Sequence, residues 1–447
     1  MPVRADDGRD FDINVSVAIV GGGACGLTAA LAARDAGRDV MLFERDSTPG
    51  GSTAMSSGMI PACGTRLQRE AGIDDDTPEH MAADIQARAR GTADTNLLNL
   101  VCRESGPAID WLTERHGLDL ELVKGPPHPG HSRQRTHAPP THDGKDLVAG
   151  LTAAAQRAGV DIVCGARVVE LITDNSDVRC VAGLVVERPD GKTERVGCAA
   201  LILASSGFGG NPDMVRRHIP AIADGAYFGH EGNRGDAILW GEKLGAELRH
   251  MGAWQGHGAI AIPHGTLVSW ALMSGGGILV NGKGIRFADE ARGSSDLAPD
   301  VVAQPGGFAW AIFDARLHES AMRFPDYRQL AELGAVKAGD DVESLARACD
   351  LPIGNLSAAL AKTGLNQPLY AIRVTGGLLH TQGGLAVDGH ARVIDRAGRP
   401  FLNLFAGGGA ACGVSGPAHW GYLSGNGLLS AVTLGRIAGR ETARVSQ

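Results

Sequence analysis

The chain has 447 residues, enough for two or three domains, and its 42 basic against 50 acidic residues give a net charge of −8. That balance, with no run of five Lys or Arg, argues against a nucleic-acid-binding surface. No apolar stretch reaches the roughly 18 residues of a membrane span, and the eight cysteines contain no C-x-x-C pair. We therefore expect a soluble, cytoplasmic globular protein with no zinc ribbon and no attached c-type haem.

The first predicted elements are a strand, a glycine-rich turn, a helix and a second strand. An apolar run at 15–20 leads into the turn at 21–26, and an Ala/Leu-rich helical pattern covers 27–36. A second apolar run at 40–43 ends at Glu44. This order is typical of a dinucleotide-binding βαβ unit, in which the acid after the second strand accepts hydrogen bonds from the adenosine ribose.

The turn itself has the pattern G-x-G-x-x-G. Gly21 allows the tight turn, Gly23 lets a pyrophosphate approach the backbone, and Gly26 lets the helix pack closely on the strand. At Ala24 and Cys25, the helix N-terminus directs unpaired N–H groups and the positive end of its dipole toward the phosphates. We therefore predict that the chain binds a dinucleotide.

A second stretch rich in glycine and hydroxyl residues follows Glu44 and runs from Pro49 to Gly58. Its distance along the chain places it beyond the first pyrophosphate site, and it is typical of an extended cofactor whose flavin ring reaches beyond the ribose. The cofactor-binding residues expected after Glu44 are Arg45, Gly50, Gly51, Ser52, Thr53, Ser57 and Gly58.

The segment 21–60 resembles the N-terminal signature of the fumarate reductase/succinate dehydrogenase flavoprotein family, which also includes ketosteroid dehydrogenases, tricarballylate dehydrogenase and urocanate reductase. The resemblance implies an α/β fold: a Rossmann-like FAD-binding domain with a central parallel sheet and an inserted α+β cap domain. Members with covalent FAD carry a His just after the double glycine. Ser52 stands there in this chain, so the resemblance implies non-covalent FAD.

The middle of the chain is predicted to be helical at 81–116 and 147–158, with strands at 161–164 and 166–171 and a hairpin at 173–194. A Pro-rich loop at 125–140 and the residues just after it carry four histidines. Their irregular spacing favours a solvent-facing or pocket-lining loop over a metal site. The histidines are His128, His131, His137 and His142.

Two later segments resemble family segments that close over FAD. The strand at 199–204 runs into A-S-S-G, where the family reads A-T-G-G, and residues 401–412 with a helix at 428–440 resemble the C-terminal flavin segment. The start of that helix is implied to face the N1/C2=O edge of the flavin. The further FAD contacts implied are Val168, Ala204, Ser205, Gly207, Gly408, Gly409, Ser424, Asn426, Gly427 and Leu428.

Between these segments the pattern changes to short mixed elements. Residues 275–290 resemble the cap stretch G-G-I-L-V-N…G-x-R-F-x-x-E of the family. We expect an FAD-binding domain formed by 1–250 and 381–447, interrupted by a substrate cap domain at 251–380.

Several candidate substrate residues follow from the same resemblance. His257, in a Q-x-H context, and His380, in H-T-x-G-G, match substrate-binding histidines; each could donate to a substrate oxygen, and a cationic form would favour a carboxylate. Arg373 is a candidate carboxylate ligand, with a surface salt bridge as the alternative. Arg292 is the nearby candidate for the arginine that delivers a proton in fumarate reductases.

Tyr422 marks the main departure from fumarate reductases, which carry a carboxylate-clamping Arg shortly before the final G-N. The stretch G-Y-L-S-G instead resembles ketosteroid dehydrogenases and tricarballylate-type enzymes. Tyr422, assisted by Ser424, is therefore expected to polarise a carbonyl or act in acid–base chemistry; packing on the flavin ring is the alternative.

These observations predict an FAD-dependent oxidoreductase acting on CH–CH groups, which desaturates a cyclic or steroid-like ketone by hydride transfer to flavin N5. One alternative is a dehydrogenase or reductase of a di- or tricarboxylic acid, of the tricarballylate or fumarate type. Another is a non-catalytic flavin-binding redox protein. Because the sequence has no haem or iron–sulfur signature, we expect a separate electron acceptor: a quinone, a carrier protein or oxygen.

Overall fold

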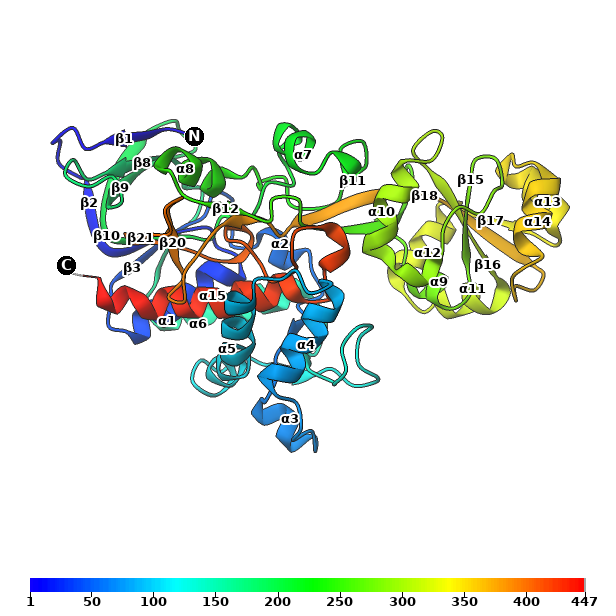
Figure 1. The fold of residues 1–447 in the computed structure, drawn as a ribbon, viewed down its shortest axis with the longest axis horizontal. Helices are drawn as coiled ribbons and strands as arrows, with labels where there is room; N and C mark the ends of the chain where they lie inside the picture. The colour runs from blue at the N-terminus through cyan, green and yellow to red at the C-terminus, as the bar shows by residue number, and fades with distance from the viewer. Residues whose placement is uncertain (446–447) are drawn as a thin grey trace. The chain divides into compact units, whose positions relative to one another are not determined.

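The computed structural model describes residues 1–445, which fold into two compact units (Figure 1). The first contains Met1–Met214, Gly229–Ala253 and the chain from Thr381 onward; the second contains Val215–Phe228 and Trp254–His380. The domain limits expected from the sequence place Val215–Phe228 in the FAD-binding domain, whereas in the structure this segment belongs to the second unit. That segment packs with the second unit because its strand β11 (Ala226–Tyr227) pairs with β18 (Leu369–Thr381).

The first unit is built on a nine-stranded sheet in which a parallel block, β7-β3-β2-β10, forms one side. Strand β10 is long enough to take two partners on its other edge: the antiparallel β9 along 193–197 and the parallel β21 along 201–203. The strands are β1 (Val3–Ala5), β2 (Ile13–Val20), β3 (Val40–Phe43), β7 (Asp161–Val163), β8 (Arg167–Thr173), β9 (Val181–Glu187), β10 (Thr193–Leu203), β20 (Arg392–Ile394) and β21 (Pro400–Ala406).

Helices α1 (Ala24–Asp35) and α15 (Asn426–Glu441) pack against each other beside this sheet (Figure 1). Their contact is close because small residues line it. A Cβ on Gly435 would lie 2.5 Å from the Cys25 carbonyl oxygen, and one on Gly439 would lie 2.1 Å from that of Ala29. The last helix of the chain is therefore fixed against the helix that follows the glycine-rich turn.

The single helix predicted at 81–116 is wrong, because the structure has two helices, α4 (Pro78–Arg88) and α5 (Thr95–Glu114). Asp94 starts the second one by accepting hydrogen bonds from the N–H groups of Asn96 and Leu97. The remaining elements of this unit are α2 (Gly51–Ala54), β4 (Ile60–Pro61), α3 (Arg66–Glu70), β5 (Glu121–Leu122), β6 (Thr136–Ala138), α6 (Gly144–Arg157), α8 (Asp236–Leu244), β12 (Leu248–Arg249) and β19 (Gly384–Leu385).

The second unit has a seven-stranded, largely antiparallel sheet centred on β18, with hydrophobic clusters packed around it. Its other strands are β11, β13 (Trp254–Ala261), β14 (Thr266–Leu267), β15 (Ile278–Asn281), β16 (Ala309–Asp314) and β17 (Val336–Gly339). Its helices are α9 (Ala271–Ser274), α10 (Ser294–Val302), α11 (Ala315–Ala321), α12 (Pro325–Glu332), α13 (Val342–Cys349) and α14 (Ile353–Leu360), with α7 (Pro212–His218) spanning the first change of unit in the chain. The predicted α/β fold class is confirmed. Within residues 1–445, none of the helices combines the length and apolar character needed to cross a membrane.

Candidate functional site

The carboxyl ends of four parallel strands meet at one edge of the first sheet. Val20 pairs with Phe43 and Leu203, and Leu203 pairs with Ala406, so the segments that follow these strands start side by side. In doubly wound α/β folds, ligands bind outside this edge. The four segments begin with Gly21, Glu44, Ala204 and Gly407, so the structure brings most of the predicted cofactor residues of this unit together.

The three glycines of the turn are required for different reasons. A Cβ on Gly21 would lie 2.5 Å from the Ala204 carbonyl oxygen, and one on Gly26 would lie 1.9 Å from that of Gly21. A Cβ on Gly23 would meet nothing closer than the Thr53 hydroxyl at 3.4 Å. Packing within the protein therefore requires glycine at 21 and 26, whereas Gly23 leaves room for a ligand.

The start of α1 offers donors to an anion. The Ala24 N–H donates to the Thr53 hydroxyl at 3.0 Å, whereas the N–H groups of Cys25 and Gly26 have no acceptor within residues 1–445. Free N–H groups at a helix N-terminus are suited to a pyrophosphate. The prediction that the second glycine stretch lies beyond this point is wrong for Thr53, because the short helix α2 turns the chain back to the start of α1.

Glu44 is buried beside the same turn. Its carboxylate accepts hydrogen bonds from the N–H of Gly22 at 2.7 Å and from that of Asp46 at 3.0 Å. Burial raises the pKa of Glu44, and the two N–H groups counteract that rise. The remaining lone pairs of the carboxylate can accept from ribose hydroxyls, as the sequence predicts.

The segment 230–233, which the sequence did not single out, lies beside the predicted residues after Glu44. Arg45 Nη1 donates to the Gly232 carbonyl oxygen at 3.0 Å, and Asn233 Nδ2 donates to the Ser52 hydroxyl at 2.8 Å. Asn233 is buried, and nothing in its local sequence distinguishes it from an ordinary loop residue. The other predicted residues lie in two places: Gly50, Gly51, Ser57 and Gly58 around α2, and Val168 in the buried part of β8.

After β10 the chain makes a crowded turn against Gly409. A Cβ on Gly207 would lie 2.0 Å from the Thr381 hydroxyl, which itself accepts from the Phe208 N–H at 3.1 Å. The Ser205 hydroxyl is buried and has no partner within residues 1–445. Because a buried hydroxyl is normally hydrogen-bonded, Ser205 is a fitting contact for a polar group of a dinucleotide.

Ser206 occupies this turn with φ +64, a left-handed conformation that favours glycine. We expect Ser206→Gly to raise the free energy of unfolding by about 0.5–1 kcal/mol, because relief of the strain outweighs the extra freedom of the unfolded chain. Urea unfolding of the FAD-free protein measures this difference. Ser205→Gly, at a position without positive φ, is the control and should destabilise; equal effects of the two changes would contradict the strain argument.

Tyr422 lies just before α15 and is held through its backbone. Arg88 Nε donates to the Tyr422 carbonyl oxygen at 3.1 Å, and His131 Nε2 lies 3.0 Å from that of Ser424. Burial raises the pKa of the Tyr422 hydroxyl to about 12, and the N–H groups of Gly425 and Gly427, which donate to its oxygen, act in the opposite direction. The phenol is therefore neutral at physiological pH and can donate its proton.

The histidine-bearing loop supports this segment. A Cβ on Gly130 would lie 2.6 Å from Leu423 Cδ1, next to the His131 contact. Fully buried Arg135 binds Asp76 with two hydrogen bonds and anchors the loop. His137 Nε2 lies 2.9 Å from the Thr65 hydroxyl, and burial lowers its pKa to about 4. Within residues 1–445, no group of three His, Cys, Asp or Glu side chains is placed to hold a metal ion.

His257 lies on β13 in the second unit and is 8% exposed. Its Nδ1 accepts a hydrogen bond from the Ala259 N–H at 3.2 Å, which leaves the ring proton on Nε2. Burial lowers the pKa of His257 to about 4. The side chain is therefore a neutral hydrogen-bond donor at physiological pH, in contrast to the cationic form considered from the sequence.

The other candidate residues of this unit have separate surroundings. The Arg373 guanidinium lies over the Phe308 ring, 4.0 Å from its centroid. Arg292 forms a solvent-exposed ion pair with Asp300 at 2.7 Å. His380 lies near the end of β18. Of these, Arg292 already has an acidic partner, whereas Arg373 has none within residues 1–445.

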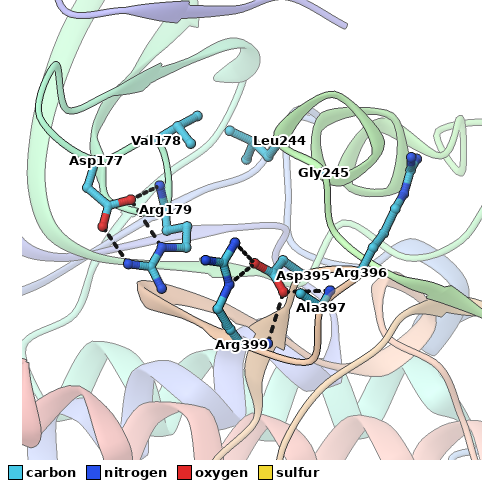
Figure 2. A pocket seen from close by; sticks show the side chains of 9 residues that line it. All are labelled: Asp177, Val178, Arg179, Leu244, Gly245, Asp395, Arg396, Ala397 and Arg399. Atoms are coloured by element: carbon cyan, nitrogen blue, oxygen red, sulfur yellow. Dashed lines mark hydrogen bonds and ion pairs between the residues drawn. The ribbon is translucent and has the colours of Figure 1, made fainter.

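A cavity of about 510 Å³ lies elsewhere in the first unit, between the β8–β9 turn and the β20–β21 turn (Figure 2). Two ion pairs, Asp177–Arg179 and Asp395–Arg399, line it. These turns are at the opposite end of β21 from Gly407. The cavity is therefore separate from the edge where the cofactor residues gather.

Comparison with known proteins identifies the family of this chain. Residues 16–428 match the FAD binding domain family. The chain belongs to this family. The room at Gly23, the free N–H groups of α1 and the unpartnered Ser205 hydroxyl fit a dinucleotide cofactor of this kind.

The relatives include enzymes with different substrates. Over 96% of its length the chain is 30% identical to the probable fumarate reductase Ifc3 of Shewanella frigidimarina, of which it covers 74%. The open conformation of a flavocytochrome c3 fumarate reductase matches with a TM-score of 0.85 and 29% identity, covering 98% of this chain and 82% of that one. The 3-ketosteroid-Δ4-(5α)-dehydrogenase of Rhodococcus jostii RHA1, in complex with 4-androstene-3,17-dione, matches with a TM-score of 0.78 and 25% identity, covering 100% of both chains.

These matches confirm the predicted family and the prediction of an FAD-dependent oxidoreductase acting on carbon–carbon bonds. The sequence motifs identified the glycines and Glu44 correctly as neighbours. They missed Thr381 and Asn233, because these residues reach the site through long-range packing that no local pattern encodes.

Proposed function

We propose that the protein desaturates a ketone between the carbons α and β to its carbonyl, and that Tyr422 polarises the carbonyl oxygen. The observation that carries this proposal is the state of the Tyr422 hydroxyl. Its oxygen accepts from two backbone N–H groups at the start of α15, while its pKa of about 12 keeps its own proton in place. A neutral donor of this kind suits a carbonyl oxygen.

The protein's part in this reaction is to make the α carbon acidic and to manage one proton. A hydrogen bond from Tyr422 withdraws electron density from the carbonyl, so the proton on the α carbon is transferred more easily to a general base. Bound FAD supplies the acceptor for the hydride that leaves the β carbon.

We further propose that FAD is held without a covalent bond, since the position after the double glycine is Ser52 and its hydroxyl is bound by Asn233. We also propose that a separate electron acceptor completes the reaction. The ketosteroid dehydrogenase with 25% identity over its whole length acts on a compound of the proposed class and supports the proposal.

A second candidate is a dehydrogenase or reductase of a di- or tricarboxylic acid. It is favoured by the 30% identity to a fumarate reductase and by exposed Arg373, whose guanidinium has no acidic partner within residues 1–445. An arginine of this kind suits a carboxylate. The resemblance described above places uncharged Tyr422 where fumarate reductases carry a carboxylate-binding arginine, so we rank this candidate second.

Anaerobic mixing of the FAD-loaded protein with two panels of compounds tests the choice. Saturated 3-ketosteroids and oxocyclohexane derivatives should bleach the flavin absorbance near 450 nm within seconds to minutes, because hydride transfer reduces it. Succinate and tricarballylate should leave it unchanged. Bleaching by the acids alone would establish the second candidate, and the dithionite-reduced protein mixed with fumarate checks the reverse direction.

A further inference from the structure

One peptide group connects His131 with Tyr422. The carbonyl oxygen of Ser424 accepts a hydrogen bond from His131 Nε2 at 3.0 Å. The N–H of the same peptide group belongs to Gly425, and it donates to the hydroxyl oxygen of Tyr422. Because the C=O and N–H of a trans peptide point in opposite directions, His131 and the Tyr422 hydroxyl approach this group from opposite ends.

The contact with Ser424 decides which nitrogen of His131 carries the proton. A backbone carbonyl oxygen only accepts hydrogen bonds, so Nε2 is the protonated nitrogen. Nδ1 then has a bare lone pair, which is buried and has no partner in the part of the chain that the structure describes. His131 is 8% exposed, and burial lowers its pKa. The ring is therefore neutral at physiological pH, and its only N–H is directed at the peptide group.

Helix α4 fixes both sides of this arrangement. Asp84 Oδ2 accepts from the N–H of Ser132 at 2.8 Å and from Arg135 Nη1 at 2.7 Å, which holds the histidine-bearing loop. One turn later on the same face of α4, Arg88 Nε donates to the Tyr422 carbonyl oxygen at 3.1 Å. The loop and the Tyr422 segment are therefore positioned by the same helix.

A hydrogen bond at one end of a peptide group strengthens the hydrogen bond at its other end. When the C=O accepts a donor, electron density moves from the nitrogen to the oxygen, so the N–H becomes a better donor. A stronger N–H bond to a phenol oxygen in turn makes the phenol O–H more acidic, and hence a better donor to a third group. The Nε2–H of His131 therefore acts on the hydroxyl of Tyr422 across the peptide group.

We propose that His131 is a positioning residue for Tyr422: its Nε2–H, acting through the peptide group of residues 424 and 425, makes the Tyr422 hydroxyl a stronger hydrogen-bond donor. The inference rests on the proposed function, in which Tyr422 donates to the substrate carbonyl. It adds to that site a residue that the sequence places only in a Pro-rich loop. His131 keeps its proton throughout, so the proton taken from the α carbon does not pass to it.

Stopped-flow reduction of the FAD-loaded protein by a saturated cyclic ketone tests the role of the Nε2–H. His131→Leu removes the donor and should lower the rate at saturating ketone by roughly three- to tenfold, the effect of one neutral hydrogen bond, with little change in KM. His131→Gln, whose amide nitrogen can reach the same carbonyl oxygen, should restore most of the rate. Equal losses in the two variants would show that the ring only packs there and would overturn the proposal.

Combination with Tyr422→Phe separates action through the phenol from any other route. Once the hydroxyl is absent, adding His131→Leu should change the rate by less than about twofold, because the group on which His131 acts is gone. A full further loss would overturn the proposal. His128→Leu is the matched control, since His128 belongs to the same loop and contacts His131 through its backbone carbonyl, which the substitution keeps. It should retain the unaltered rate, and a loss equal to that of His131→Leu would also contradict the proposal.

NMR of the FAD-loaded protein tests the connection without turnover. With tyrosine labelled by ¹³C at Cζ, the resonance that Tyr422→Phe removes should move in His131→Leu and return in His131→Gln, while those of the other three tyrosines stay in place. A Tyr422 resonance that does not move would overturn the inference. A resonance that moves in a protein whose flavin no ketone bleaches would reject the proposed function alone.

The unaltered protein gives a last measurement, which decides the question even if a variant fails to fold. Labelling of histidine with ¹⁵N, with His131 assigned through its backbone amide, should show a neutral ring with its proton on Nε2. A proton on Nδ1 would leave Nε2 with no hydrogen to donate to the Ser424 carbonyl oxygen, and the proposal would be overturned.

Discussion

Tyr422→Phe is expected to lower kcat for a saturated cyclic ketone by roughly 10²–10⁴-fold, because it removes the donor that polarises the carbonyl while keeping the ring. The FAD spectrum and affinity should be unchanged, since the backbone of residue 422 keeps its hydrogen bond from Arg88. Because burial raises the pKa of Tyr422 to about 12, loss of its proton should not reduce the rate at any pH below about 10. Stopped-flow measurement of flavin reduction over that range gives both results.

Tyr370→Phe is the matched control for this change. Tyr370 is another phenol, stacked on His318 in the second unit with a ring separation of 4.1 Å, and it has no place in the proposed chemistry. Its removal should leave flavin reduction within about twofold. If the ketone reduced the flavin of Tyr422→Phe as fast as that of the unaltered protein, Tyr422 would have only a packing role. The carbonyl-polarising mechanism would then be rejected.

Gly26→Ala should weaken FAD binding strongly. The added Cβ would lie 1.9 Å from the Gly21 carbonyl oxygen, so α1 must move away from the turn that follows β2. Overpacking of this kind costs about 1–3 kcal/mol, and it would displace the N–H groups that we propose as the pyrophosphate site. We expect FAD affinity to fall by roughly 10²-fold, which the ratio of absorbance at 450 nm to that at 280 nm after purification and direct titration will measure.

Gly354→Ala is the control for a glycine in open space. It lies in α14, where a Cβ would meet nothing within 4 Å, so this variant should remain yellow and be slightly more stable. Circular dichroism separates loss of FAD from loss of fold in Gly26→Ala. A folded Gly26→Ala protein that binds FAD with unchanged affinity would mean that the close approach of helix and turn is not needed for the cofactor.

The extent to which the sequence predicts this site differs between its parts. The strand–turn–helix order around Gly21 is local, so spacing alone locates its elements and the reason for each glycine. The contact of Thr53 with the start of α1 could not be predicted, because it depends on the four-residue helix α2. A helix this short leaves no periodic pattern in the sequence. His257 is neutral because it is buried within the second unit, which lowers its pKa. This burial results from packing between segments far apart in the sequence, so the local Q-x-H context does not encode it.

The long strand β10 makes the order of synthesis important. Its first half pairs with β9, which precedes it in the chain, but its second half pairs with β21, which is synthesised much later, and the cofactor edge also needs α15, which comes later still. A chain synthesised only as far as residue 399 therefore lacks both elements, and the second half of β10 has no partner on that edge. A premature stop codon anywhere before residue 426 should yield a product without α15 that does not retain the cofactor.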